Sequence, residues 1–339
     1  MEKRGIVNGS LGTSINRMRR RSSGKCLAAA VLSAVLVTET LAIGNFETAG
    51  MPYAAFSALP SERLEIAGAR LDVAFAPSAQ HVPRVAIIHW ITQSARATAA
   101  YYGQFPVKDV QILVMPVTGA GVRGGTSYGY GGAAIKVPVG SASTERHFAR
   151  DWVMTHEMVH LALPGLRSSQ RWLEEGIATY VEPIARAQAG QLSAAQVWAS
   201  MVDGLPNGLP QAGDHGLDHT PTWGRTYWGG ALFCLLADIE IRQRTANKRG
   251  LQDALRAINR AGGNIEKSWP ISRVLQIGDD ATGVPVLRET YDRMKAAPSE
   301  VELDELWARL GVERSGATVT FNEDAPLAAI RRAITEKRS

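Results

Sequence analysis

The chain has 339 residues, of which 45% are hydrophobic and 20% are charged, as in globular proteins with a sizeable core. Residues 1–42 hold seven of the 37 Lys and Arg residues and two of the 32 Asp and Glu residues, so the net charge of +5 belongs to this segment. The rest of the chain is electrically balanced and has no basic stripe with interleaved aromatic residues, so its composition gives no support to nucleic-acid binding.

The first 42 residues have the pattern of an export signal. A basic run that ends at Lys25 precedes an apolar stretch over residues 26–37, and small and polar residues follow up to Ala42. The apolar stretch has the length of a signal-peptide core and is short for a membrane span of about 20 residues. We therefore expect residues 1–42 to be the signal peptide of a periplasmic or secreted protein. The alternative is an uncleaved N-terminal anchor, and no other stable membrane insertion is expected.

Cys26 and Cys234 are the two cysteines of the sequence. Removal of the signal peptide would leave one of them, so neither an internal disulfide nor a cysteine metal site is expected. Cys234 lies in the apolar run 231–237, which is typical of a small core residue rather than of a nucleophile.

The segments after the signal predict a small sheet with one helix. Residues 43–62 are expected to be a loose linker, and residues 63–248 one domain. Period-2 alternation or a short apolar run predicts each strand, and a longer segment that becomes helical predicts the helix. The expected strands cover residues 70–76, 110–117 and 133–139, and the expected helix lies within 82–105.

The second half of the chain is predicted to be helical. One helix is expected from Thr144 to Leu163, where Pro164 and Gly165 end it. Another begins near Arg171. A third covers residues 227–245, and short amphipathic helices make up a C-terminal region over 249–339. The fold class that follows is α+β, with a small sheet and helices.

A glycine-rich stretch, Gly119 to Gly132, separates two of the expected strands. It has no Gly-Lys-Ser/Thr sequence and does not open a helix, so it is neither a phosphate loop nor a dinucleotide-binding fingerprint. A hairpin or flexible loop is expected, either as a plain connection or as a loop beside a catalytic cleft.

The sequence "HEMVH", residues 156–160, carries the chemistry. Residues i and i+4 share one helix face, so His156 and His160 can direct their imidazoles at one metal ion. Glu157 lies between them and can act as the general base. The alternative is a helix with two incidental histidines.

A third ligand is expected from the segment "WLEEGIATY", residues 172–180. A catalytic zinc site uses three protein ligands and keeps one position open. Glu174 and Glu175 are both candidates, but they point about 100° apart on a helix, so one of them can face the metal.

The two motifs together resemble the gluzincin peptidases, particularly the peptidase-MA-like group, which includes the membrane alanyl and the glycyl aminopeptidases. In these families the third ligand is the glutamate directly before glycine, which implies Glu175. The resemblance also implies that residues 63–248 are a thermolysin-like catalytic domain with a small mixed sheet and active-site helices. It implies one Zn²⁺ per chain and a peptide or protein as substrate.

A third match, "YWGGALFCLLADIEIRQRT" over residues 227–245, resembles the helix that follows the ligand glutamate in both aminopeptidase groups. It implies that Tyr227 binds the oxyanion, the alternative being an aromatic residue that packs on the core. Gly230 matches the family glycine, and Gly229 stands where the family has lysine. The region "SYGYGGAAIKV" lacks the acidic residue that binds a substrate's free amine in the alanyl aminopeptidases, so strict aminopeptidase specificity receives no support.

Three further assignments are expectations. Glu182 lies seven residues after Glu175 on the same helix face and could orient a ligating histidine, or it could be a solvated surface residue. Arg225 could hold a substrate carboxylate. A second metal site is a remote alternative for the loop that contains Asp214, His215, Asp218 and His219. The function expected is a zinc peptidase outside the cytoplasm, and the alternative is an inactive peptidase-like binding or scaffold protein.

Overall fold

The computed structural model describes residue 46, residues 48–78 and residues 81–337. The expected signal peptide, residues 1–42, lies outside the described residues. Residues 43–339 form one compact unit. Among the residues that the structure describes, every helix is too short or too polar to span a lipid bilayer.

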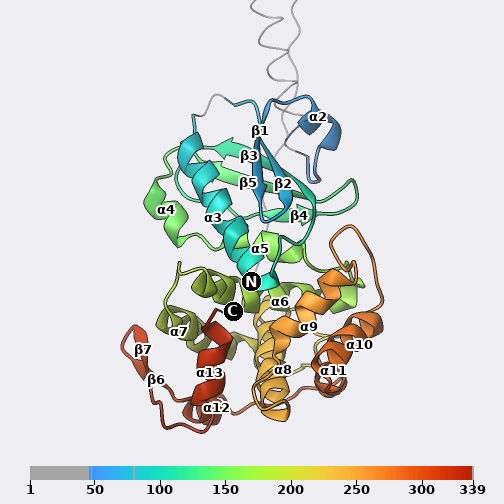
Figure 1. Cartoon of the computed structure of the whole chain (residues 1–339), viewed down its shortest axis with the longest axis vertical. Helices are drawn as coiled ribbons and strands as arrows, with labels where there is room; N and C mark the ends of the chain where they lie inside the picture. Colours follow the sequence, from blue (N-terminus) through green and yellow to red (C-terminus); the bar gives the residue numbers. More distant parts are fainter. Residues whose placement is uncertain (1–45, 47, 79–80, 338–339) are drawn as a thin grey trace, which may run out of the picture. The chain divides into compact units, whose positions relative to one another are not determined.

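A five-stranded mixed sheet lies at one end of this unit (Figure 1). The strand order is β1-β2-β3-β5-β4. The β2–β3 and β3–β5 pairs are parallel, and the β1–β2 and β4–β5 pairs are antiparallel, so both edge strands run against the central ones. The strands are β1 (Ser61–Ile66), β2 (Ala69–Phe75), β3 (Asp109–Val117), β4 (Thr126–Tyr128) and β5 (Ala134–Gly140).

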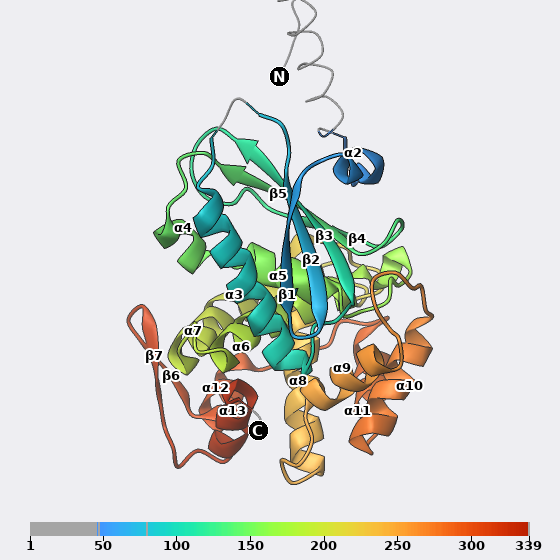
Figure 2. The same cartoon turned by 45° about the horizontal axis from the view of Figure 1, so that its top comes forward.

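One face of the sheet packs on α3 (Arg84–Tyr102), which runs beside the strands in Figure 2. The buried strand residues of this face alternate along β2 and β3, as the period of a half-buried strand requires. The cluster also contains Met154 and Met158, whose helix carries the "HEMVH" motif. The sheet and α3 therefore pack against the helix that carries the motif and fix its position.

The other face of the sheet corrects the expectation of a loose linker over residues 43–62. This segment contains the short helix α2 (Tyr53–Ser57) and the first two residues of β1. Phe46, Met51 and Phe56 are each at most 5% exposed and pack with Leu113 of β3. These apolar residues are too widely spaced to give a helix or strand period, so the sequence pattern missed them.

The single helix expected from Thr144 to Leu163 is two helices, α4 (Glu145–Arg150) and α5 (Val153–His160). Asp151 between them is extended, with φ −73° and ψ 138°. Its Oδ1 accepts a hydrogen bond from Met154 N at 3.3 Å, as a residue before a helix commonly does. The break starts a new helix shortly before His156.

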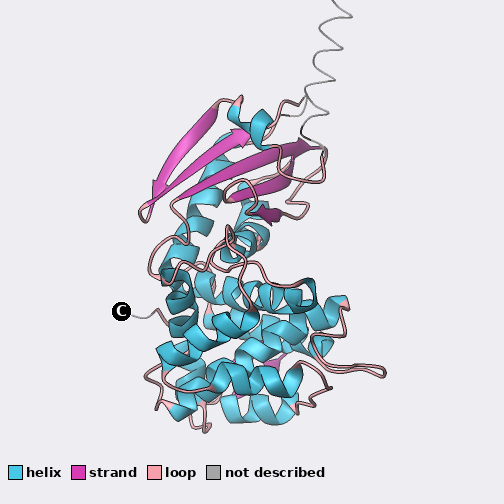
Figure 3. Ribbon diagram, turned by 90° about the vertical axis from the view of Figure 1, so that its right-hand side faces the viewer, coloured by secondary structure: helices cyan, strands magenta, loops and turns pink. Residues whose placement is uncertain are grey.

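Helices make up the rest of the unit, apart from one hairpin (Figure 3). The expected helices at 171 and 227–245 are present as α6 and α8. A hairpin with a turn at Gly316, φ +60°, was not expected within the C-terminal region. The elements are α6 (Arg171–Gln188), α7 (Ala194–Gly204), α8 (Gly230–Arg244), α9 (Leu251–Arg260), α10 (Ile271–Thr282), α11 (Val286–Met294), α12 (Leu303–Leu310), β6 (Val312–Ser315), β7 (Thr318–Phe321) and α13 (Ala328–Thr335).

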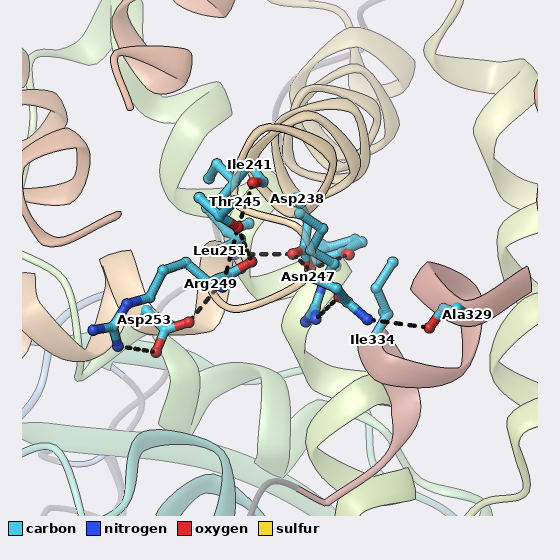
Figure 4. Close-up of polar contacts among 12 residues, drawn as sticks. Asp238, Ile241, Thr245, Asn247, Arg249, Leu251, Asp253, Ala329 and Ile334 are labelled. Atoms are coloured by element: carbon cyan, nitrogen blue, oxygen red, sulfur yellow. Dashed lines mark hydrogen bonds and ion pairs between the residues drawn. The ribbon is translucent and has the colours of Figure 1, made fainter. Parts of the chain in front are cut away.

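A buried carboxylate joins α8 to its neighbours. Asp238 Oδ2 accepts a hydrogen bond from the Tyr180 hydroxyl of α6 at 2.9 Å, and its Oδ1 accepts from Leu251 N at the start of α9, also at 2.9 Å (Figure 4). Just beyond α8, Asn247 Nδ2 donates to the carbonyl of Ala329 in α13 at 3.4 Å. The C-terminal helices share one hydrophobic cluster with α6 and α8, so the chain continues across residue 248 without a break in its core.

Candidate metal centre and catalytic cleft

Helices α5 and α6 bring His156, His160 and Glu175 together. His156 Nε2 lies 3.2 Å from His160 Nε2, and Glu175 Oε2 lies 3.3 Å from the first nitrogen and 3.4 Å from the second. In a tetrahedral zinc site with bonds of about 2.0–2.1 Å, neighbouring ligand atoms are roughly 3.3–3.4 Å apart. The three donors therefore fit one zinc ion, and a combination of two imidazoles and a carboxylate is a catalytic zinc set.

Arg171 holds the second oxygen of Glu175. Its Nε and Nη2 donate to Glu175 Oε1 at 3.2 and 3.0 Å. This fork leaves Oε2 directed at the two histidines. Sequence reasoning missed Arg171, although its position four residues before Glu175 on one helix is the signal that could have found it.

Burial and hydrogen bonding act in opposite directions on the three donors. Burial lowers the pKa of His156, against the hydrogen bond with Glu175. Burial also acts to lower the pKa of His160, but the hydrogen bond with Glu175 and the charge of Glu157 outweigh it and raise that pKa. For Glu175, burial is outweighed by hydrogen bonds with both histidines, which hold the pKa well below its usual range. Glu175 is therefore a carboxylate, the form that binds a metal.

Glu157 lies beside the donor set and is 8% exposed. Ser127 Oγ of β4 is 2.7 Å from Glu157 Oε2 and 2.8 Å from the Glu157 carbonyl oxygen. The glycine-rich loop therefore lies over the catalytic helix, which favours the second of its two expected roles. At Gly125 a Cβ would be 2.7 Å from Glu157 Cγ, so a larger residue would push the loop away from the helix.

A cavity of about 430 Å³ opens in front of these side chains. The glycine-rich loop and β4 line one side, and α5 and α6 line the other. Two aromatic residues, Trp152 and Tyr227, complete its wall. The volume lies within the range of ligand-binding clefts.

Tyr227 stands opposite the donor set on a turn of π-helix, Arg225–Gly229, which precedes α8. Such turns occur often at functional sites. Its ring stacks on that of His156, with centroids 6.3 Å apart and an interplanar angle of 21°. Burial and the charge of Glu175 raise the pKa of Tyr227, so it stays a neutral hydroxyl that can donate a hydrogen bond.

Two glycines allow α6 and α8 to cross this closely. A Cβ on Gly176 would be 2.3 Å from Gly230 Cα, and a Cβ on Gly230 would be 2.1 Å from the Trp172 carbonyl oxygen. No side chain fits between the two backbones. Gly176, directly after Glu175, and Gly230, three residues after Tyr227, thus set the distance between the donor set and the tyrosine.

Glu174 is turned away from the donor set, although it lines the cavity. Its Oε1 accepts a hydrogen bond from Leu166 N at 2.6 Å. Adjacent residues on a helix point about 100° apart. Glu174 therefore binds the backbone of the loop before α6, while Glu175 faces the histidines.

The structure contradicts the role expected for Glu182. Its Oε1 accepts a hydrogen bond from Arg186 Nη1 at 2.9 Å, and it is 7% exposed rather than a surface residue. Seven residues along a helix restore the same face but add about 10 Å of length. Glu182 is therefore two turns from Glu175 and does not orient a ligating histidine.

The substrate-binding role expected for Arg225 is also wrong. This side chain is 3% exposed, and its Nε lies 2.7 Å from Asp214 Oδ2. Its Nη1 donates to the Gly208 carbonyl. Residues two apart on a helix face different ways, so Arg225 points into the core where Tyr227 points into the cleft.

The remaining candidates belong to the core or to local contacts. Asp214 pairs with Arg225, and Asp218 accepts hydrogen bonds from Trp172 Nε1 and the Tyr291 hydroxyl, each at 2.7 Å. Within the described ranges, the single group of three metal-ligating side chains is His156, His160 and Glu175. Cys234 is fully buried, as expected of a core residue.

No family model matches the sequence, and no curated protein matches it. The fold is similar to that of an aminopeptidase N family protein from Idiomarina loihiensis, with a TM-score of 0.56 and 13% identity over 75% of this chain and 49% of that chain. An M1 zinc metallopeptidase from Deinococcus radiodurans gives a TM-score of 0.45 and 13% identity over 72% of this chain and 53% of that chain. The chain spans about half the length of either protein.

At this identity the first likeness concerns the fold alone. The architecture is mixed α+β, with a small mixed sheet and many helices, as expected. The resemblance to gluzincin peptidases inferred from "HEMVH" and "WLEEGIATY" is confirmed at the level of the fold.

Proposed function

We propose that this chain is an exported zinc-dependent peptidase with a thermolysin-like catalytic centre. The observation that carries the proposal is the donor triangle of His156, His160 and Glu175, whose edges of 3.2–3.4 Å suit one zinc ion. The general base candidate, Glu157, lies directly beside the triangle and lines the same cavity.

His156, His160 and Glu175 would hold the zinc ion, and Arg171 would keep Glu175 in place. When bound, zinc supplies Lewis acidity to a water molecule and to the scissile carbonyl. Glu157 accepts the proton of the attacking water at its carboxylate and delivers it to the leaving amine. The hydroxyl of Ser127 holds Oε2 of this carboxylate, so its orientation is set before the substrate arrives.

Tyr227 and β4 supply the remaining parts. Tyr227 donates a hydrogen bond to the oxyanion that develops on the scissile carbonyl, a contribution of about 3 kcal/mol. β4 is an edge strand that lines the cavity, so one of its edges is unpaired within the sheet. An extended peptide can add to such an edge through main-chain hydrogen bonds. The site thus suits a peptide or protein substrate.

Export is part of the same proposal, and the pattern of residues 1–42 supports it. N-terminal sequencing of the protein from its native host tests it, with a mature terminus expected near Ile43. An intact Met1 in a soluble cytoplasmic fraction would contradict it. The second class of function, an inactive scaffold, gives no chemical reason for Glu157, Ser127 and Tyr227 to surround the donor set.

Cleavage of a peptide library by the purified protein tests the peptidase proposal. Zinc content should be one ion per chain, and hydrolysis should stop with a chelator and return with added zinc. Glu157→Gln should retain zinc and lose about 10²–10⁴-fold in turnover. A protein that binds no zinc would contradict the metal centre, and wild-type hydrolysis by Glu157→Gln would show that the activity arises elsewhere.

A further inference from the structure

A second cavity continues from the catalytic cleft on the far side of His156 and Tyr227. It has a volume of about 490 Å³ and shares three residues with the cleft, namely Trp152, His156 and Tyr227. Because these residues line both spaces, the second cavity adjoins the part of the cleft that contains His156 and Tyr227. Helices α6 and α7 form its other walls.

Aromatic rings line the junction in an unbroken row. Trp223 stacks on Tyr227 at 6.2 Å, Tyr227 stacks on His156 at 6.3 Å, and Trp152 meets His156 edge to face at 5.2 Å. Trp228 adds a third indole to the wall. Because the rings are arranged in this way, an aromatic side chain of a ligand could stack on one ring or contact another edge to face.

Two of these indoles are open to solvent. Trp152 is 51% exposed and Trp223 is 63% exposed. Val85 and Tyr130 are the other two large apolar residues with high exposure among those the structure describes. Exposed indoles that flank a concave site are typical of a binding surface, since covering them removes apolar area from water.

The two ionisable side chains on the α6 wall of the cavity are bonded to each other. Glu182 and Arg186 both line it, and they form an ion pair at 2.9 Å with both side chains buried. Arg186 Nη2 also donates to the Ala149 carbonyl at 3.0 Å. A charged ligand would meet polar groups that already bind each other or the Ala149 carbonyl, so the cavity favours an uncharged occupant.

We propose that this cavity is a subsite for a bulky aromatic side chain of the peptide substrate, next to the scissile bond. A cavity of roughly 150 Å³ is enough to accept a benzene ring, so the space accepts a phenyl, phenol or indole group together with adjoining backbone. The inference rests on the proposed peptidase function and names its substrate class. It assigns Trp152, Trp223 and Trp228 to substrate selection.

Matched peptides test the subsite. Each pair is identical except for Phe or Ala at one position flanking the cleaved bond, and both flanks are sampled. At one fixed flank, kcat/KM for the Phe peptide should exceed that for the Ala peptide by at least about 10-fold. Lys and Glu at that position should do no better than Ala.

Variants distinguish an effect on side-chain selectivity in the cavity from an effect on the catalytic centre. Ser200 lines the cavity from α7 and is exposed, so Ser200→Trp should fill the space and bring the Phe-to-Ala ratio close to one. Trp223→Ala should lower the ratio several-fold. The ratio is measured within each variant, so a general change in activity cancels. Val85→Ala removes exposed apolar surface elsewhere and should change neither the ratio nor the activity.

A binding measurement makes the subsite testable without turnover. Calorimetric titration of Glu157→Gln with the same peptides should show tighter binding of the Phe peptide, and Ser200→Trp should abolish the difference. Chelator-sensitive hydrolysis with equal rates for Phe and Ala peptides would overturn the subsite and leave the peptidase intact. Absence of hydrolysis would overturn the proposed function, and equal affinities in the titration would then overturn the subsite as well.

Discussion

Ser127 Oγ lies 2.7 Å from Glu157 Oε2, across 30 residues of sequence, and 2.8 Å from the carbonyl oxygen of the same residue. A hydroxyl has one proton, so it donates to one of these acceptors at a time. The contact joins the edge strand β4 to the catalytic helix α5. The strand that we propose to bind the peptide backbone therefore also contacts the candidate base, Glu157.

Ser127→Ala should lower kcat by about 10-fold, because a hydrogen bond to a charged group contributes about 1.5–3 kcal/mol and its loss frees the carboxylate to rotate. KM should change little, since the side chain of Ser127 is assigned no contact with substrate. Steady-state kinetics on a cleaved peptide measures both. Ser127→Thr keeps the hydroxyl and should restore most of the activity.

Ser57→Ala is the matched control, because the Ser57 hydroxyl donates to the Tyr53 carbonyl within helix α2, and Ser57 does not line the cavity. Its kinetics should equal those of the wild type. An unchanged kcat in Ser127→Ala, or a Ser127→Thr protein as slow as Ser127→Ala, would show that the Ser127 hydroxyl has no catalytic role.

Arg171→Gln should weaken zinc binding by about 10–100-fold, the usual effect of removing a residue that orients a metal ligand. The reason is the fork from Arg171 to Glu175 Oε1, which leaves Oε2 for the metal. Competition with a chromophoric chelator measures the affinity. Arg167→Gln removes the same charge at an exposed position four residues earlier and should leave the affinity unchanged. Equal affinities for both variants would mean that Glu175 needs no support.

Glu175→Gln should lower zinc affinity by orders of magnitude, whereas Glu174→Gln should keep one zinc per chain. Glu175 Oε2 is 3.3 Å from His156 Nε2, and Glu174 instead accepts a hydrogen bond from Leu166 N. Elemental analysis after dialysis distinguishes the two. The reverse result would transfer the third-ligand role to Glu174.

Local patterns predicted the elements that carry the site, because its ligands lie on helices whose spacing is regular. The i, i+4 spacing of His156 and His160 defines a shared helix face without tertiary information. The sheet strands at 70–76, 110–117 and 133–139 were likewise visible in period and apolar character. Such features depend on residues a few positions apart, which the sequence displays directly.

Contacts between residues far apart in the chain could not be predicted from the sequence. The contact of Ser127 with Glu157 depends on how a glycine loop folds over a helix, and no local pattern encodes it. Glu182 shares a helix face with Glu175, but its distance along the axis and its pairing with Arg186 decide its role. Arg225 illustrates the same limit, since proximity to Tyr227 in sequence placed it at the cleft while its partner Asp214 draws it into the core.

Glu182→Gln should change how stability depends on pH. Burial raises the pKa of Glu182 to about 7 and outweighs the opposing effect of Arg186, and burial raises the pKa of nearby Asp151 to about 6. A carboxyl group whose pKa is raised on folding stabilises the protein below its unfolded pKa of about 4.5 and loses that contribution as pH rises through the folded value. Deprotonation places a charge in a buried site that already faces Asp151.

The melting temperature of the wild type, relative to that of Glu182→Gln, should therefore fall by several degrees between pH 5 and pH 8. Subtraction of the two curves cancels the titrations that Glu182 does not influence, including those of the metal ligands. Glu145→Gln, at an exposed position on α4, is the matched control and should differ from the wild type by a constant amount over this range. A difference between wild type and Glu182→Gln that stays constant from pH 5 to pH 8 would show that Glu182 keeps one protonation state throughout, and the ion pair with Arg186 would then outweigh the burial of the carboxylate.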